Sequence, residues 1–144
     1  MTRFESTRFG PLEVADDRVL EFPRGLPGFP DCRQFILMEH DRETPLRWLQ
    51  CVNRPEVAFL IADPQEILDA YAVEVPRHVL AYLGWNESGD APADVLLFVI
   101  LNAADASLTA NLRAPVVVHA RTRRAFQLIL DDPSLSLRHP IAPT

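Results

Sequence analysis

The sequence predicts a mostly β protein, a single small antiparallel β-barrel-like domain with one or two short helices. Three observations lead to this prediction. Short apolar runs recur along the chain, turn-forming residues separate them, and only two short stretches favour a helix. About eight to ten short strands are therefore expected, and strands spaced in this way favour an antiparallel barrel or sandwich over alternating strands and helices.

The first half of the chain is predicted to be strands and turns. Residues 23–30 interrupt them, because the three prolines and two glycines in this stretch exclude both helix and strand interior. Leu26 and Phe29 of this rigid loop are expected to pack onto the core. The run 57–62 is nearly all apolar and is expected to be central in the sheet. The strands expected in this half are residues 2–9, 12–14, 18–22, 32–39, 46–52 and 57–62.

The second half begins with two short predicted helices. Asp63 can cap a helical turn that ends near Ala70, with Pro64 tolerated at its first position. We expect a strand at 71–75, a helix at 76–83, an exposed loop at 84–93 and a buried strand at 94–102. Val116–Val118 and Ala125–Leu130 are then expected to form a core hairpin around the polar turn 119–124. Pro115 is placed at the start of the first hairpin strand, where a missing N–H costs least.

The length of the chain limits how many domains it can form, and its net charge limits which kinds of partner it suits. We expect residues 1–144 to form one domain, with about 133–144 as a partly ordered C-terminal tail. No apolar run approaches the ~20 residues of a membrane span, and the start lacks the apolar segment of a signal peptide. We therefore expect a cytoplasmic protein with no membrane partner. The net charge of -6 argues against direct nucleic-acid binding and suits a basic protein partner.

No catalytic motif, cofactor site or metal site is predicted. The four histidines do not stand at metal-ligand spacing, and all 14 basic residues are arginine, which excludes a lysine nucleophile. Cys32 and Cys51 are expected to be buried free thiols, and to form a redox pair only if the strands place them side by side. A small cysteine-dependent enzyme that uses Cys51 and His78 stays open as an alternative.

Acidic residues flank the predicted central strand and the short helix after it. They form either an ordinary solvated face or a docking surface for a basic partner, in which an aromatic side chain serves as an anchor. The candidate partner-binding residues are Glu56, Asp63, Glu66, Asp69, Tyr71 and Glu74.

A set of short motifs also follows one another in a specific order and spacing. They are Phe22, Gly25-Leu26-Pro27-Gly28-Phe29, Phe35, Leu49-Gln50, Ala58-Phe59, Asp63-Pro64, Tyr71, Asn111-Leu112, Ala114 to Val118, and Gln127 to Leu130. With these motifs the chain resembles the FliW flagellar assembly factor family, from about Phe4 to Pro143. Most of the motif residues can be explained structurally, because glycine and proline set the path of a loop and polar side chains satisfy backbone groups in turns. The family-motif residues interpreted as structural are Gly25, Leu26, Pro27, Gly28, Phe29, Gln50, Asn111, Pro115 and Gln127.

The resemblance implies a small β-barrel-like protein without catalytic activity that exchanges two protein partners. One partner is newly made flagellin in the cytoplasm. The other is CsrA, a small basic RNA-binding regulator that blocks translation of flagellin mRNA. Export of flagellin frees the factor, which then captures CsrA and relieves the repression. The protein is expected to be a monomer when it is free.

The chain departs from the family pattern at several places. Cys51 replaces the usual serine, His119 stands where asparagine is common, and the tail ends at Thr144, short for a segment that helps some members bind CsrA. These departures leave a second possibility open, a flagellin-only export chaperone that does not bind CsrA.

Overall fold

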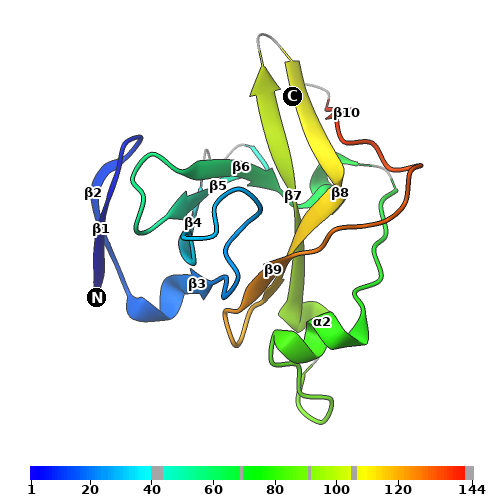
Figure 1. The fold of residues 1–144 in the computed structure, drawn as a ribbon, viewed down its shortest axis with the longest axis horizontal. Helices are drawn as coiled ribbons and strands as arrows, with labels where there is room; N and C mark the ends of the chain where they lie inside the picture. The colour runs from blue at the N-terminus through cyan, green and yellow to red at the C-terminus, as the bar shows by residue number, and fades with distance from the viewer. Residues whose placement is uncertain (40–43, 69, 91, 105–106, 142–144) are drawn as a thin grey trace.

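A computed structural model describes residues 1–39, 44–68, 70–90, 92–104 and 107–141 (Figure 1). The described part is mostly antiparallel β structure, which confirms the predicted fold class. Short helical elements are α1 (Pro64–Ile67), α2 (Arg77–Tyr82) and the 3-10 turns η1 (Asp16–Arg18) and η2 (Pro92–Asp94). The strands are β1 (Thr2–Ser6), β2 (Gly10–Val14), β3 (Val19–Glu21), β4 (Gln34–Glu39), β5 (Leu46–Cys51), β6 (Ala58–Ala62), β7 (Val95–Ala104), β8 (Ser107–His119), β9 (Ala125–Gln127) and β10 (His139–Pro140).

The main sheet has eight strands in the order β10-β8-β7-β6-β5-β4-β3, with β9 added beside β8. Figure 1 shows the long β7–β8 hairpin standing beside the shorter strands β3–β6, with the separate β1–β2 hairpin at the far side. The sheet is open, because no ladder joins β3 to β9. A single bridge between Glu21 and Arg124 brings the two ends together, so the domain resembles a barrel without closing into one.

The central strand is β6, as the sequence predicts. It lies between β5 and β7, and Ile61 on it is fully buried. Ile61 belongs to a cluster in which the Phe22 and Phe35 rings meet edge to face, 5.0 Å apart. Aromatic pairs in this geometry stabilise a core beyond the area that they bury. This cluster packs β3–β6 against β8 and β9 and so holds the main sheet together.

The predicted strand at 71–75 is wrong. This segment runs extended from α1 to α2 but pairs with no strand. Tyr71 packs on one apolar cluster while Val73 and Val75 pack on another, so the sequence alternates although the backbone forms no ladder. An alternating sequence indicates that every second side chain is buried. An extended segment can bury its side chains in this way without pairing as a strand.

Pro115 does not begin its strand, contrary to the prediction. The strand β8 starts at Ser107, and Pro115 lies inside it at a large bulge. Phe98 of β7 faces Val116, but Ile100 of β7 faces Asn111, so β8 carries extra residues between these pairs. Proline is tolerated at bulges because its missing N–H costs no ladder hydrogen bond there.

The bulge in β8 also explains why the last hairpin strand is shorter than predicted. The strand β9 pairs with β8 in the predicted hairpin but ends at Gln127. The next residues hydrogen-bond to the bulge, with Leu128 N donating to Pro115 O at 2.8 Å and Leu130 N donating to Arg113 O at 2.7 Å. The bulge therefore carries this segment away from the regular sheet and leaves room in front of β7.

In the part of the chain that the structure describes, no helix is long and apolar enough to cross a membrane.

Candidate functional site

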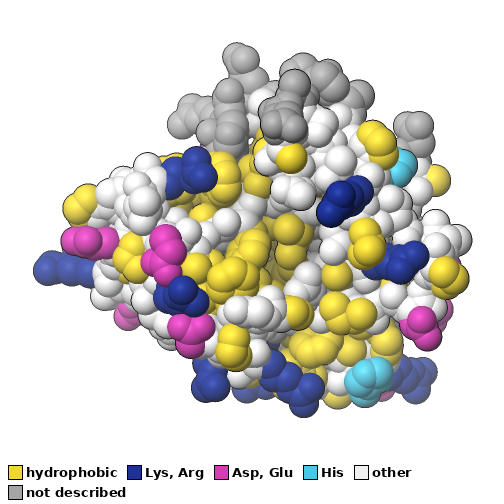
Figure 2. Space-filling view, turned by 45° about the horizontal axis from the view of Figure 1, so that its top comes forward, with side chains coloured by type: hydrophobic (Ala, Val, Ile, Leu, Met, Phe, Trp, Pro, Cys, Tyr) yellow, Lys and Arg dark blue, Asp and Glu magenta, His cyan; other side chains and the backbone are white. Residues whose placement is uncertain are grey.

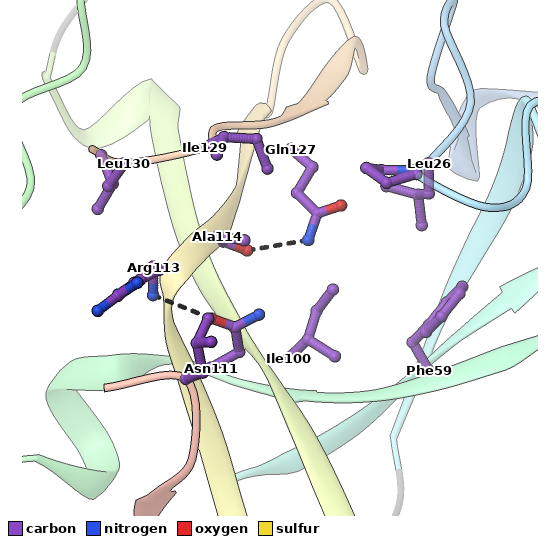
Figure 3. Close-up of a pocket in the computed structure, with 11 residues that line it drawn as sticks. Leu26, Phe59, Ile100, Asn111, Arg113, Ala114, Gln127, Ile129 and Leu130 are labelled. Carbon is purple, nitrogen blue, oxygen red and sulfur yellow. Dashed lines mark hydrogen bonds between the residues drawn. The ribbon is translucent and has the colours of Figure 1, made fainter. Parts of the chain in front are cut away.

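An apolar groove of about 450 Å³ lies in front of the bulge in β8 (Figure 3). The loop after β3 forms one wall, β6 and β7 contribute to the floor, and the chain after β9 forms the other wall. Figure 2 shows hydrophobic side chains gathered in a hollow in the middle of one face of the molecule. The groove is lined by Leu26, Pro27, Phe59, Ile100, Asn111, Arg113, Ala114, Gln127, Ile129, Leu130 and Leu137.

The glycine–proline loop builds the first wall. Gly25 has a φ of +65°, and a Cβ on it would lie 2.6 Å from the carbonyl oxygen of Phe29, so only glycine fits. Leu26 and Phe29 exchange backbone hydrogen bonds across the loop, and Leu26 is buried. The Phe29 ring meets Phe59 of β6 edge to face at 5.4 Å, which pins the loop as predicted. The motif read as loop punctuation therefore also shapes the groove.

Two amide side chains satisfy the backbone of the bulge. Asn111 Oδ1 accepts a hydrogen bond from Arg113 N at 3.0 Å, and Gln127 Nε2 donates one to Ala114 O at 3.1 Å. In Figure 3 the Asn111 amide nitrogen points toward Ile100, and the Gln127 amide oxygen points toward Leu26 across the groove. A mostly apolar groove with a few convergent polar groups is typical of a binding site.

The outer rim of the groove exposes large apolar side chains. Ile129 is 63% exposed and Leu137 is 55% exposed. Arg113 holds the segment that carries Leu137, because its Nε donates to Leu135 O at 2.6 Å and its guanidinium also donates to Pro133 O at 3.0 Å. Exposed apolar side chains next to an apolar groove mark a surface that another protein can cover.

The partner-binding residues predicted from the sequence did not include Ile129, Leu137 or Arg113, although Ile129 belongs to the motif Gln127 to Leu130. The sequence signal that could have found the tail is its three large apolar residues, Leu135, Leu137 and Ile141, in an otherwise polar and proline-rich stretch. Leu135 and Ile141 pack on the cluster beside β8, and Ile141 N donates to Leu108 O at 2.9 Å. The tail is therefore part of the described fold as far as Ile141.

The structure separates the acidic residues proposed to form one surface. Asp63 caps α1, where its Oδ1 accepts from Gln65 N at 2.9 Å, and Glu66 lies exposed on the same helix. Glu74 is exposed on the segment that leads to α2. Glu56 lies at the opposite end of β6, where it pairs with Arg54 at 2.9 Å. Asp69 lies outside the described residues.

Tyr71 is half-buried beside the acidic helix. Its hydroxyl donates to Leu112 O at 2.6 Å, and burial raises its pKa to about 12. It also contributes to a second hollow of about 610 Å³, together with Asp63 and Arg47. The structure thus brings Asp63, Glu66 and Tyr71 to one end of β6 and leaves Glu56 at the other.

Gln50 of β5 is fully buried. Its Nε2 donates to the carbonyl oxygens of Cys51, Pro55 and Val57 at 3.0 to 3.2 Å, and its Oε1 accepts from Ser6 Oγ at 2.7 Å. One amide therefore fastens the β5–β6 turn to the β1–β2 hairpin.

The cysteine and histidine considered for catalysis do not meet. Cys51 is fully buried in the core cluster and lies 3.1 Å from Asn53 Oδ1, whereas His78 is exposed on α2. Cys32 and Cys51 are free thiols, as predicted, and both are fully buried in the same core cluster. Burial, and then the contact with Cys51, raise the pKa of Cys32 to about 12. Among the described residues, no group of three or more His, Cys, Asp or Glu side chains is placed to hold a metal ion.

An open antiparallel β domain with an apolar groove at the bulge of its longest strand defines a small β-sheet binding domain. Comparison with known proteins gives the family. The model of the FliW protein family matches residues 3–141. The chain belongs to the FliW family.

Individual relatives agree with this assignment. The flagellar assembly factor FliW of Desulfitobacterium hafniense strain DSM 10664 / DCB-2 is 33% identical over 141 residues, covering 98% of this chain and 91% of the relative. The flagellar assembly factor FliW of Natranaerobius thermophilus is 32% identical, covering 96% and 91%. A crystal structure of the flagellar assembly factor FliW matches with a TM-score of 0.87 and 30% identity, covering 99% of this chain and 98% of that one.

Proposed function

We propose that this protein binds flagellin in the cytoplasm and antagonises CsrA by direct protein binding, which relieves repression of flagellin mRNA translation. The observation that carries the proposal is the match to the FliW family across residues 3–141. Flagellin and CsrA enter through the family resemblance. The two surfaces described above support the proposal because each suits one kind of partner.

The apolar groove suits a segment of flagellin. Its floor and walls are already formed, so little ordering is needed before a partner binds. Ile129 and Leu137 remain exposed in the free protein, and a bound apolar segment would remove them from water. Gln127 and Asn111 offer one acceptor and one donor to the backbone of such a segment (Figure 3).

The acidic end of α1 suits a basic partner such as CsrA. Asp63 caps the short helix α1 and Glu66 lies within it, and the chain carries a net charge of -6. Charges of this kind steer a basic partner to the surface and contribute binding that weakens with salt. We therefore propose that CsrA binds at α1 and that flagellin binds in the groove.

The test is calorimetric titration of the purified protein with the host's CsrA and with flagellin, at two salt concentrations. A double variant with Asp63→Asn and Glu66→Gln removes both charges but keeps an N-cap side chain. Its affinity for CsrA is expected to fall and to lose salt dependence, while its affinity for flagellin stays unchanged. The matched control is the double variant with Glu5→Gln and Asp17→Asn, which removes two exposed charges elsewhere.

Each result of the titration has a definite meaning. Equal CsrA affinity in the two double variants would refute the assignment of CsrA to α1. Flagellin binding without CsrA binding would support the flagellin-only export chaperone instead. Binding of neither partner would refute the proposed function.

A further inference from the structure

Three arginines gather at the end of the sheet where β3 meets the β8–β9 turn. The guanidinium carbon of Arg24 lies over the Tyr82 ring, 5.2 Å from its centroid. Arg124 donates from its guanidinium to the backbone oxygen of Tyr82 at 3.4 Å. Arg123 donates to the backbone oxygen of Asp16 at 3.2 Å. Figure 2 shows arginine side chains along the lower edge of the molecule, where α2 and this turn lie in Figure 1.

None of these three arginines belongs to an ion pair among the described residues. The nearby acidic groups have other partners. The Asp16 carboxylate pairs with the N-terminal ammonium group at 3.3 Å and accepts from Thr2 Oγ1 at 2.7 Å, and Glu21 accepts from Gln34 Nε2 at 3.0 Å. Asp90 pairs with His119 at 2.7 Å and with Arg121. Three arginines outside the ion pairs of the described residues are thus grouped on a chain whose net charge is -6.

Tyr82, which contacts two of these arginines, has a feature that is unusual for an ordinary solvent-exposed surface. Its hydroxyl is shielded from solvent and has no hydrogen-bond partner among the described residues. Buried polar groups in native proteins are nearly always paired, so an unpaired one calls for an explanation. The ring packs edge to face on Phe126 at 5.6 Å, with Arg24 over its face. Tyr82 therefore keeps a hydroxyl donor that no described residue uses, beside Arg24 and Arg124.

The turn itself is strained in a way that positions one arginine. Arg123 has a φ of 62°, the one left-handed non-glycine residue in the described part of the chain. Its N–H donates to His119 O at 2.8 Å, which closes the turn. A non-glycine residue in this region is disfavoured, and such positions concentrate at functional sites.

We propose that Arg24, Arg123, Arg124 and Tyr82 form a docking surface for an acidic segment of a protein partner. Guanidinium groups bind carboxylates through paired, charge-assisted hydrogen bonds. The Tyr82 ring and the backbone oxygens already hold these groups, so less side-chain freedom is lost on binding. The Tyr82 hydroxyl supplies one further donor to a carboxylate. This surface is separate from the groove and from α1, and it does not rest on the partners proposed above.

The test uses the full chain and a fluorescein-labelled oligoglutamate peptide, measured by anisotropy at ~50 and ~300 mM salt. Binding is expected at low salt and is expected to weaken at high salt, with no binding of an oligolysine peptide. The variant with Arg24→Gln and Arg124→Gln is expected to bind at least about tenfold more weakly. The matched control, with Arg3→Gln and Arg138→Gln, has the same net charge and is expected to bind like the parent.

Two single variants make the test specific. Tyr82→Phe removes only an unpaired hydroxyl, so it is expected to keep its thermal stability and to bind oligoglutamate several-fold more weakly, up to about tenfold. Arg123→Gly suits the left-handed backbone and removes only the side chain, so it is also expected to fold and to bind more weakly. Both variants report on the site without the risk of unfolding.

Three results would overturn the proposal. One is equal affinity in the Arg24/Arg124 variant and its control. A second is unchanged affinity in both Tyr82→Phe and Arg123→Gly. The third is tighter binding of a single-stranded oligonucleotide than of oligoglutamate, which would make this a phosphate-binding surface instead.

Discussion

Replacing Ile129 and Leu137 by alanine is expected to weaken flagellin binding far more than it weakens the fold. The two side chains are 63% and 55% exposed in the free protein. Full burial of such a side chain is worth about 1.5–3 kcal/mol, so the exposed part of each can contribute about 1–2 kcal/mol when a partner covers it. Alanine keeps part of that area, and together the two changes should cost about 2–3 kcal/mol of binding. This corresponds to a roughly 30- to 150-fold higher Kd.

The assay is calorimetric titration of flagellin into the double alanine variant, with a urea denaturation curve for each protein. The parts of the two side chains that are already buried should contribute about 1–2 kcal/mol to unfolding, so the variant stays folded. Leu96→Ala is the matched control, since Leu96 is a large exposed aliphatic residue, 38% exposed, outside the groove. An affinity within about threefold of the parent, in a folded variant, would show that flagellin does not cover this rim.

Three further predictions concern the fold that supports the groove. Gly25→Ala should destabilise the protein by several kcal/mol, because its Cβ would lie 2.6 Å from a backbone oxygen, whereas Gly28→Ala, with nothing within 4 Å, should cost only about 1–2 kcal/mol for its positive φ; equal denaturation midpoints would contradict this. Gln50→Glu should destabilise more than Gln50→Met in the same measurement, since it turns a carboxylate oxygen toward backbone carbonyl oxygens. Cys32 and Cys51 should resist alkylation by iodoacetamide near neutral pH and react after unfolding, because both are buried and the pKa of Cys32 is raised to about 12; rapid labelling of the folded protein would refute their burial.

The raised pKa values also predict how stability depends on alkaline pH. A thiol or phenol whose pKa is higher in the folded state contributes stability that is complete below its unfolded pKa. For Cys32 this value is 9.0 and for Tyr71 it is 10.0, and both rise to about 12 on folding. Stability should therefore fall progressively from about pH 9 to about pH 12, and Tyr71→Phe should remove the part of the loss that begins near pH 10, as followed by denaturant titration at each pH.

Much of the fold could be predicted because local pattern and final environment agree. The strand at 57–62 is apolar on both faces because β6 is central, and the Asp63-Pro64 pair starts a helix through a cap that needs only neighbouring residues. The segment 71–75 misled the prediction because packing on two clusters produced the alternation of a strand without its hydrogen bonds.

The sequence by itself determined the family signature, the order of most strands, and a loop at 23–30 whose glycines and prolines allow few paths. Only the tertiary structure decided what these motifs build together. The bulge in β8 and the tail held by Arg113 bring Leu26, Gln127 and Leu137 to one groove, although they are distant in the chain. Acidic residues that are close in sequence were likewise divided between the two ends of β6. Local sequence encodes backbone preferences, but it does not encode which distant side chains share a surface, because that depends on strand register and on where the ladder is interrupted.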